Sequence, residues 1–149
     1  MMEAWITNSG ILIAGGLIFL AVIYLAVIRN IEAQRISKKF DKNDILLVSF
    51  GVNFYGLETE PGGLLRSTGV LALLKNGLYY RARYSKREVF IPGHSIKKIE
   101  VVDFHKGKPI HLKVFGIQFI NENKTTDRAA FRMPYPDRWA SAIKSHFQA

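Results

Sequence analysis

An unbroken run of apolar residues near the N-terminus is the feature that most constrains this chain. Ile11–Ile28 contains no charged residue in 18 positions. At about 1.5 Å per residue, a helix of this length spans about 27 Å, close to the ~30 Å hydrocarbon core of a bilayer. We therefore expect residues 1–29 to form a single-pass transmembrane anchor, with Trp5 and Tyr24 as interfacial aromatic residues.

The charges that flank this run predict its orientation. Glu3 precedes it, whereas the cations that follow are Arg29, Arg35, Lys38 and Lys39. A cleaved signal peptide, the alternative, would have a positive N-terminal region and a shorter apolar core. By the positive-inside rule, we expect a retained anchor with the N-terminus outside and the rest of the chain cytoplasmic. The four cations are predicted either to contact anionic headgroups of the cytoplasmic leaflet or only to set the orientation of the anchor in the membrane.

Residues 30–43 are interpreted as a juxtamembrane connector, and residues 44–149 as the folded domain. Within the connector, Ile36 and Phe40 are spaced as neighbours on one face of a helix. We therefore expect the helix of the anchor to continue to about Lys39.

After the connector the pattern changes to short runs with the two-residue alternation of β-strands. In Leu78–Tyr84, apolar residues alternate with Arg81 and Arg83, so both arginines are predicted to point away from the core. Asn76-Gly77 precedes this run and is a strong hairpin signal, because both residues tolerate the positive φ of a type I′ turn. About seven strands are expected in total.

A later strand shows a change of phase in its alternation. Ile110, Leu112 and Val114 are predicted to face the core, but beyond Gly116 the apolar positions shift by one residue. Such a shift beside a glycine predicts a β-bulge or a sharp bend at that point.

The C-terminal segment predicts a helix. Pro134 and Pro136 end the strands, because proline cannot donate to a sheet ladder. In Asp137–Phe147, Trp139 and Ile143 fall on one apolar face at helical spacing. This stretch is therefore predicted to pack on the sheet as one amphipathic helix.

Basic residues dominate the expected surface. The net charge is +9, and residues 41–149 carry 17 Lys and Arg against 10 Asp and Glu, a net +7. Such a field favours anionic phospholipids, acidic proteins or nucleic acid as partners. Strand pairing would gather the outward cations into two basic faces, the first formed by Arg81 and Arg83 and the second by His111, Lys113, Arg128 and Arg132. Each face is a candidate surface for an anionic partner or an ordinary solvated face. We expect no nucleic acid, because aromatic residues are not interleaved for base stacking.

The residue types that catalysis needs are scarce or scattered. The absence of cysteine excludes disulfides, thiolate metal sites and a cysteine nucleophile. Nucleotide-binding glycine motifs and the HExxH and GxSxG motifs are also absent. One hairpin could bring Asp103, His105 and His111 together as metal ligands. We expect no cofactor and no enzymatic activity, and keep a small metal-dependent or hydrolytic enzyme as a minority alternative.

A characteristic order of strand segments runs through the middle of the chain. The segments are Gly69-Val70-Leu71-Ala72-Leu73, Gly77-Leu78-Tyr79-Tyr80, Phe90-Ile91-Pro92, Ser95-Ile96 and Val101. With the C-terminal helix, this order resembles that of GRAM domains and bacterial pleckstrin-homology-like (PH-like) domains, over roughly residues 45–147. The resemblance implies a membrane-anchored α+β chain, in which two nearly orthogonal sheets form a barrel and a C-terminal helix caps one end, with Trp139 as the plug.

The resemblance implies binding and scaffolding rather than catalysis. Lipid-reading relatives place basic residues around the loop that joins the first two strands, but here that loop, Glu58–Arg66, has two acids before a single arginine. We therefore expect a membrane-tethered recognition or scaffold module, an accessory or assembly subunit of a bacterial inner-membrane complex. Its protein partner would contact the basic faces or an apolar loop such as Leu64-Leu65. The alternative is a sensor of anionic lipid headgroups.

Overall fold

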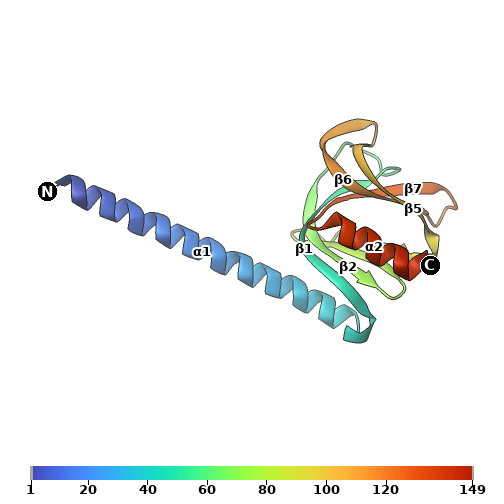
Figure 1. The fold of residues 1–149 in the computed structure, drawn as a ribbon, viewed down its shortest axis with the longest axis horizontal. Helices are drawn as coiled ribbons and strands as arrows, with labels where there is room; N and C mark the ends of the chain where they lie inside the picture. The colour runs from blue at the N-terminus through green and yellow to red at the C-terminus, as the bar shows by residue number, and fades with distance from the viewer. Residues whose placement is uncertain (1, 149) are drawn as a thin grey trace.

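The computed structural model describes residues 2–148, and the side chains of residues 9–148 (Figure 1). A long N-terminal helix is followed by a sheet domain with a second helix packed on it. The elements are α1 (Met2–Lys39), the 3-10 turn η1 (Lys42–Asp44), β1 (Ile45–Leu57), β2 (Ser67–Leu74), β3 (Gly77–Ala82), β4 (Glu88–Pro92), the 3-10 turn η2 (Gly93–Ser95), β5 (Ile96–His105), β6 (Lys108–Ile120), β7 (Thr126–Arg132) and α2 (Pro136–Phe147).

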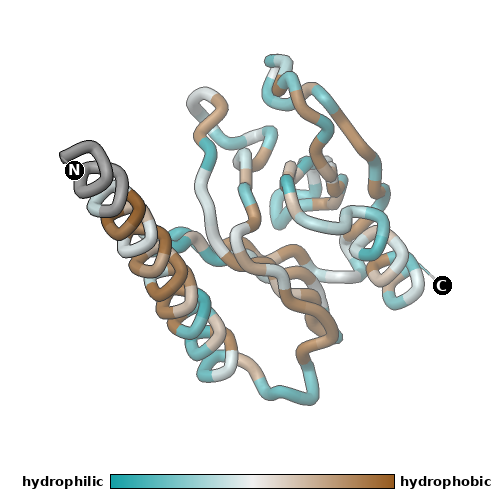
Figure 2. The backbone as a smooth tube through the Cα atoms, turned by 60° about the vertical axis from the view of Figure 1, so that its left-hand side comes forward, coloured by the Kyte–Doolittle hydropathy of each residue, from teal (hydrophilic) through white to brown (hydrophobic). Residues whose placement is uncertain are grey.

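Helix α1 is continuous through the apolar run and the connector. Its segment Ser9–Lys39 is long and apolar enough to cross a membrane, by length and composition. Figure 2 shows mostly hydrophobic colouring along the middle of the helix and hydrophilic residues near its C-terminal end. The predicted helical extension to Lys39 is confirmed. The interfacial role predicted for Trp5 lies outside the residues whose side chains are described.

The seven strands form one continuous antiparallel sheet, in the order β4-β3-β2-β1-β7-β6-β5. Strand β1 joins the two halves of the sheet, because it pairs with β2 on one side and with β7 on the other. An N-terminal apolar helix, a seven-stranded sheet and a C-terminal helix confirm the predicted α+β class.

The main core lies between the inner face of the curved sheet and α2. Trp139 is 1% exposed there, as predicted, and its indole Nε1 donates to Ser49 Oγ at 3.0 Å. Phe54 stacks on Phe131 with ring centroids 4.9 Å apart. Because every strand contributes a side chain to this cluster, the docking of α2 stabilises the whole sheet.

A second core forms on the opposite face of the sheet, where the C-terminal part of α1 packs. Ile36 is 2% exposed and lies against Val70, Ala72 and Tyr79. The alternation predicted for β3 is therefore confirmed. The outward-facing side chains of β3 are covered by α1, however, and are not exposed to solvent.

The hairpin predicted at Asn76-Gly77 is confirmed, because β2 and β3 pair on either side of a two-residue turn, but the turn is not type I′. Lys75 and Asn76 form the turn between the paired residues Leu74 and Gly77, and none of these residues has a positive φ. Glycine is needed at position 77 for another reason. A Cβ atom there would lie 2.4 Å from the carbonyl oxygen of Ile91 on β4.

The bulge predicted beside Gly116 is also wrong, because pairing between β5 and β6 is regular there. The irregularity comes earlier, where the partner of β5 jumps from Val114 to Pro109 and His111 has a φ of 58°. Leu112 is consequently 43% exposed, and Val114 packs on the outer face of the sheet instead of the core. The extra residues in β6 break the two-residue alternation on which the prediction depended.

Candidate functional site

The first predicted basic face is occupied by internal ion pairs. Arg83 donates from Nε to Glu32 Oε1 of α1 at 2.8 Å, and Glu32 is only 2% exposed. This hydrogen bond raises the pKa of Arg83 above its ordinary value. Arg81 pairs with Glu88, which also accepts from Lys39 of α1. Arg81 and Arg83 therefore hold the sheet and α1 together.

The second predicted basic face is divided. Arg128 pairs with Glu58 at 3.0 Å and with Glu100 at 3.6 Å, so its charge is largely neutralised. His111, Lys113 and Arg132 are exposed, and none of the three has an ion pair among residues 9–148. Lys113 lines one depression with His111 and another with Arg132, so these three residues remain neighbours while Arg128 is taken up by ion pairs.

The acidic residues after β1 explain part of this neutralisation. Glu60 forms an ion pair with Arg87 and, at 3.8 Å, with Lys106. Glu58 forms an ion pair with Arg128. The two acids of the Glu58–Arg66 loop therefore tie together three separate parts of the sheet domain.

The four cations that follow the apolar run also differ in their surroundings. Arg35 donates to the backbone carbonyl of Arg83 at 3.3 Å, and Lys39 lies 4.7 Å from the ring centroid of Tyr79. Lys38 is exposed to solvent. Arg29 lies over the Phe50 ring, 5.1 Å from its centroid, and so is brought to the surface of β1.

The residues considered as metal ligands are not assembled. His105 is fully buried, and its Nε2 lies 2.8 Å from the carbonyl oxygen of Gly56. Asp103 and His111 instead line a separate, solvent-facing depression. Among the described residues, no group of three His, Cys, Asp or Glu side chains is placed to hold a metal ion.

Burial lowers the pKa of His105 below its ordinary value of 6.5. The unfolded chain therefore binds a proton at His105 as the pH falls below about 6.5, whereas the folded chain does not until a lower pH. We expect the free energy of unfolding to decrease between pH 7 and pH 5, by at most about 1.4 kcal/mol per pH unit. Urea unfolding at several pH values would measure this slope.

His105→Gln is the matched variant for that measurement, since it removes the titrating group. We expect its unfolding free energy to change much less over the same range. Glu88 and Glu100 do not contribute to the slope in this pH range. Hydrogen bonds from lysines lower the pKa of both carboxyls below 4.5, so the stability that these two groups provide is lost only in more acid solution. An unchanged slope in the variant would contradict the assignment to His105.

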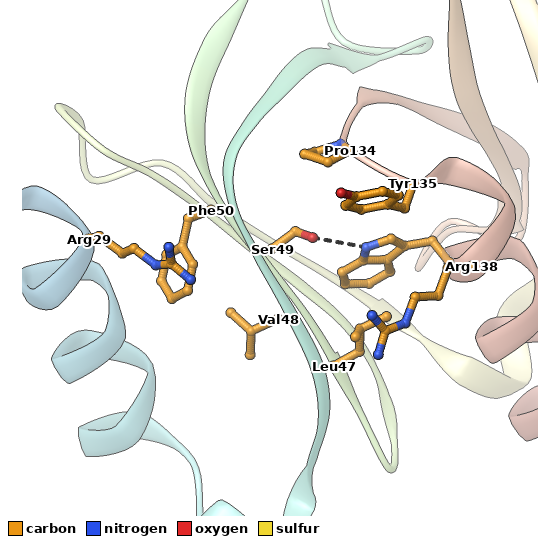
Figure 3. Close-up of a pocket in the computed structure, with 9 residues that line it drawn as sticks. Arg29, Leu47, Val48, Ser49, Phe50, Pro134, Tyr135 and Arg138 are labelled. Atoms are coloured by element: carbon orange, nitrogen blue, oxygen red, sulfur yellow. Dashed lines mark hydrogen bonds between the residues drawn. The ribbon is translucent and has the colours of Figure 1, made fainter. Parts of the chain in front are cut away.

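A pocket of about 350 Å³ lies between α1, β1 and the start of α2 (Figure 3). Sequence reasoning missed it, because its residues come from three distant segments. The lining residues are Arg29, Leu47, Val48, Ser49, Phe50, Pro134, Tyr135, Arg138 and Trp139. Figure 3 shows Arg29 on the α1 side and Arg138 and Tyr135 on the α2 side, with Ser49 between them.

Local backbone geometry creates this pocket. Tyr135 precedes α2 in the left-handed region, with φ 56° and ψ 55°, and Pro136 then begins the helix. The resulting sharp turn leaves the Tyr135 side chain 76% exposed at the rim. Strand β1 supplies the floor, and Ser49 is fixed there by the indole of Trp139.

The electrostatics of the pocket distinguish it from the predicted basic faces. Within the described part of the chain, neither Arg29 nor Arg138 has an ion-pair partner. Arg29 and Arg138 both line the pocket, and most of its other lining residues are apolar. Such a site is suited to an anionic group carried on an apolar or aromatic body, because guanidinium forks bind carboxylate and phosphate oxygens well.

Comparisons with known proteins give a fold neighbour but no family. No protein-family model matches the chain, and no curated protein matches it. Among the matching solved structures is a chain of the 8S snRNP assembly intermediate, with a TM-score of 0.55 and 11% sequence identity. The match covers 72% of this chain and 84% of that chain. At this identity the likeness concerns the fold alone.

Proposed function

We propose that this chain is a membrane-tethered recognition and scaffold module, an accessory subunit of a bacterial inner-membrane assembly. Its binding site would be the pocket between α1 and α2, and its partner a protein that presents an acidic side chain or terminal carboxylate. The observation that carries the proposal is the pair of unneutralised guanidinium groups, Arg29 and Arg138, on an apolar pocket beside the anchor.

The proposed fold is a PH-like barrel of two sheets. The strand order supports it, because β1–β4 and β5–β7 are the two halves that meet at the β1–β7 pairing, with α2 against the shared core. The proposed topology places α1 in the inner membrane as a single-pass anchor, with the N-terminus outside and the sheet domain cytoplasmic. The cations that follow the apolar run support this orientation.

Protein binding is favoured over lipid sensing because several of the predicted surface cations are already paired within the chain. Arg81, Arg83 and Arg128 form internal ion pairs, so they are not available to read headgroups. A membrane-spanning anchor would also supply attachment far stronger than headgroup contacts. The same anchor would hold the pocket near the bilayer, where a weak contact with another membrane protein acts at high effective concentration.

Charge reversal at Arg138 tests the proposal. We expect Arg138→Glu to reduce the recovery of a co-purifying protein at least tenfold when the full-length chain is purified from membranes in mild detergent, because about 1.4 kcal/mol of lost affinity is a factor of ten. Quantitative mass spectrometry of the purified complex would measure the loss. Lys144→Glu is the matched control, since it makes the same charge change on the exposed side of the same helix.

A lipid headgroup in this pocket is the second candidate, because Arg29 is the first cation after the apolar run. Native mass spectrometry of the same preparations would separate the two. Loss of a bound anionic phospholipid in Arg138→Glu, with the protein partner retained, would replace the protein-binding proposal with the lipid one. Unchanged protein and lipid in both variants would refute both uses of the pocket.

A further inference from the structure

The β1–β2 and β3–β4 loops form one end of the sheet domain. We infer that this end lies in the headgroup layer of the cytoplasmic leaflet, on the side of the membrane where α1 continues into the sheet domain. The partner of this surface is thus the lipid of the chain's own membrane. The inference rests on the membrane anchor of the proposed function, and concerns a different surface from the protein-binding pocket.

The first observation is a contact between α1 and the β3–β4 loop. The hydroxyl groups of Tyr24 and Tyr84 are 2.6 Å apart. Tyr24 lies inside the apolar run, four residues before its end at Ile28. Four residues of helix correspond to about 6 Å along the axis. Tyr84 is therefore held at the depth of the last turn of the span, where tyrosine is enriched in membrane proteins.

The second observation is that the domain is fixed against α1 by several further contacts. Passing back along α1 from its C-terminal end, Lys39 meets Tyr79, Glu32 meets Arg83 and Tyr24 meets Tyr84. Strand β3 therefore runs along α1 with its C-terminal end toward the apolar run. Buried Ile36 and the Glu32–Arg83 pair oppose any swing of the domain away from the helix.

The third observation is the composition of the loops at this end. Tyr84 is 76% exposed and Leu65 is 69% exposed, and the cations Lys86 and Arg66 beside them are also exposed. The two loops are neighbours, because Arg83 N donates to Thr68 O at 2.8 Å where β2 begins. Exposed aromatic and aliphatic side chains among cations suit a bilayer interface, where their apolar parts are buried and their charges reach the phosphates.

The opposite end of the domain provides a reference. The C-terminal end of α2 lies on the side of the domain away from the N-terminal part of α1 (Figure 1). Ser145 in its last turn is exposed and should stand in the aqueous phase. The geometry thus predicts one lipid-facing end and one solvent-facing end, with α1 setting the distance between them and the bilayer.

Site-specific labelling of the full-length chain tests this placement. Because the chain has no cysteine, Ser85→Cys, Ser145→Cys and Ala14→Cys each give a single labelling site. Each variant would be labelled with an environment-sensitive fluorophore and placed in phosphatidylcholine nanodiscs. Nitroxide quenchers attached to lipid headgroups or to acyl chains would then be compared. We expect headgroup quenching of the Ser85 label to exceed that of the Ser145 label at least threefold.

The label at Ala14 separates failure of this inference from failure of the anchor. Strong acyl-chain quenching at Ala14 with equal, weak quenching at Ser85 and Ser145 would overturn the inference and leave the anchor intact. No acyl-chain quenching at Ala14 would overturn the anchor, and the inference with it. Acyl-chain quenching at Ala14 together with the threefold difference between the two serine positions would support both.

Discussion

Replacing Trp139 by alanine should lower the free energy of unfolding of the sheet domain by about 3–5 kcal/mol. The side chain is 1% exposed and belongs to the cluster that joins α2 to every strand. Truncation would leave a cavity the size of an indole and remove the hydrogen bond to Ser49. Urea unfolding of the full-length chain in detergent, followed by circular dichroism in the β-sheet region, would measure the change.

Two further variants separate packing from hydrogen bonding at this position. Ser49→Ala removes the acceptor of the indole and should cost about 1 kcal/mol. Trp139→Phe keeps much of the apolar contact and should fall between the two other variants. A change below about 1 kcal/mol for Trp139→Ala would show that α2 lies loosely on the sheet, against the observed burial.

Trp139 also illustrates what the sequence could predict. Its helical spacing with Ile143 is a local pattern, and both side chains lie in the core as expected. The alternation in β3 is local as well, so the inward position of Leu78 and Tyr80 could be read directly. Such patterns depend on only a few neighbouring residues, and regular backbone geometry converts them reliably into a buried and an outer face.

Patterns that depend on irregular backbone could not be predicted in the same way. From Ile110 to Val114 apolar and polar residues alternate in the sequence. The extra residues around His111 in β6 nevertheless change the face of the sheet on which Val114 lies. The left-handed backbone of Tyr135 is likewise unmarked in the sequence, since a tyrosine rarely adopts it. Without that turn, the pocket beside α2 has no rim.

The predicted basic faces show a separate limit. Arg81 and Arg83 do point away from the core, but an outward side chain is exposed only if nothing covers that face of the sheet. Here α1 covers it and supplies Glu32, which is 51 positions away from Arg83 in the sequence. The two arginines of the pocket are further apart still. Contacts of this kind depend on tertiary packing, which a single sequence does not display.

Removing the carboxylate of Glu32 should have the second largest effect on the chain. Glu32→Ala would leave Arg83 without its partner between α1 and β3, where only 16% of the Arg83 side chain is exposed. We expect the sheet domain to lose about 3 kcal/mol of stability, near the lower end of the range for a broken buried ion pair, because Arg83 retains some access to water. Urea unfolding of the full-length chain in detergent would measure this loss.

Two further variants test whether the loss of stability in Glu32→Ala comes from leaving a buried charge without a partner. Asp44→Ala breaks an ion pair with Lys75 whose side chains are 56% and 54% exposed, so it should cost less than about 1 kcal/mol. The double variant Glu32→Leu with Arg83→Leu replaces the pair by apolar side chains and should recover most of the stability, since the unpaired charge is then absent. Equal losses in Glu32→Ala and Asp44→Ala would show that α1 does not bury this pair. Such a result would also remove the rigid link that places the β3–β4 loop beside the apolar run.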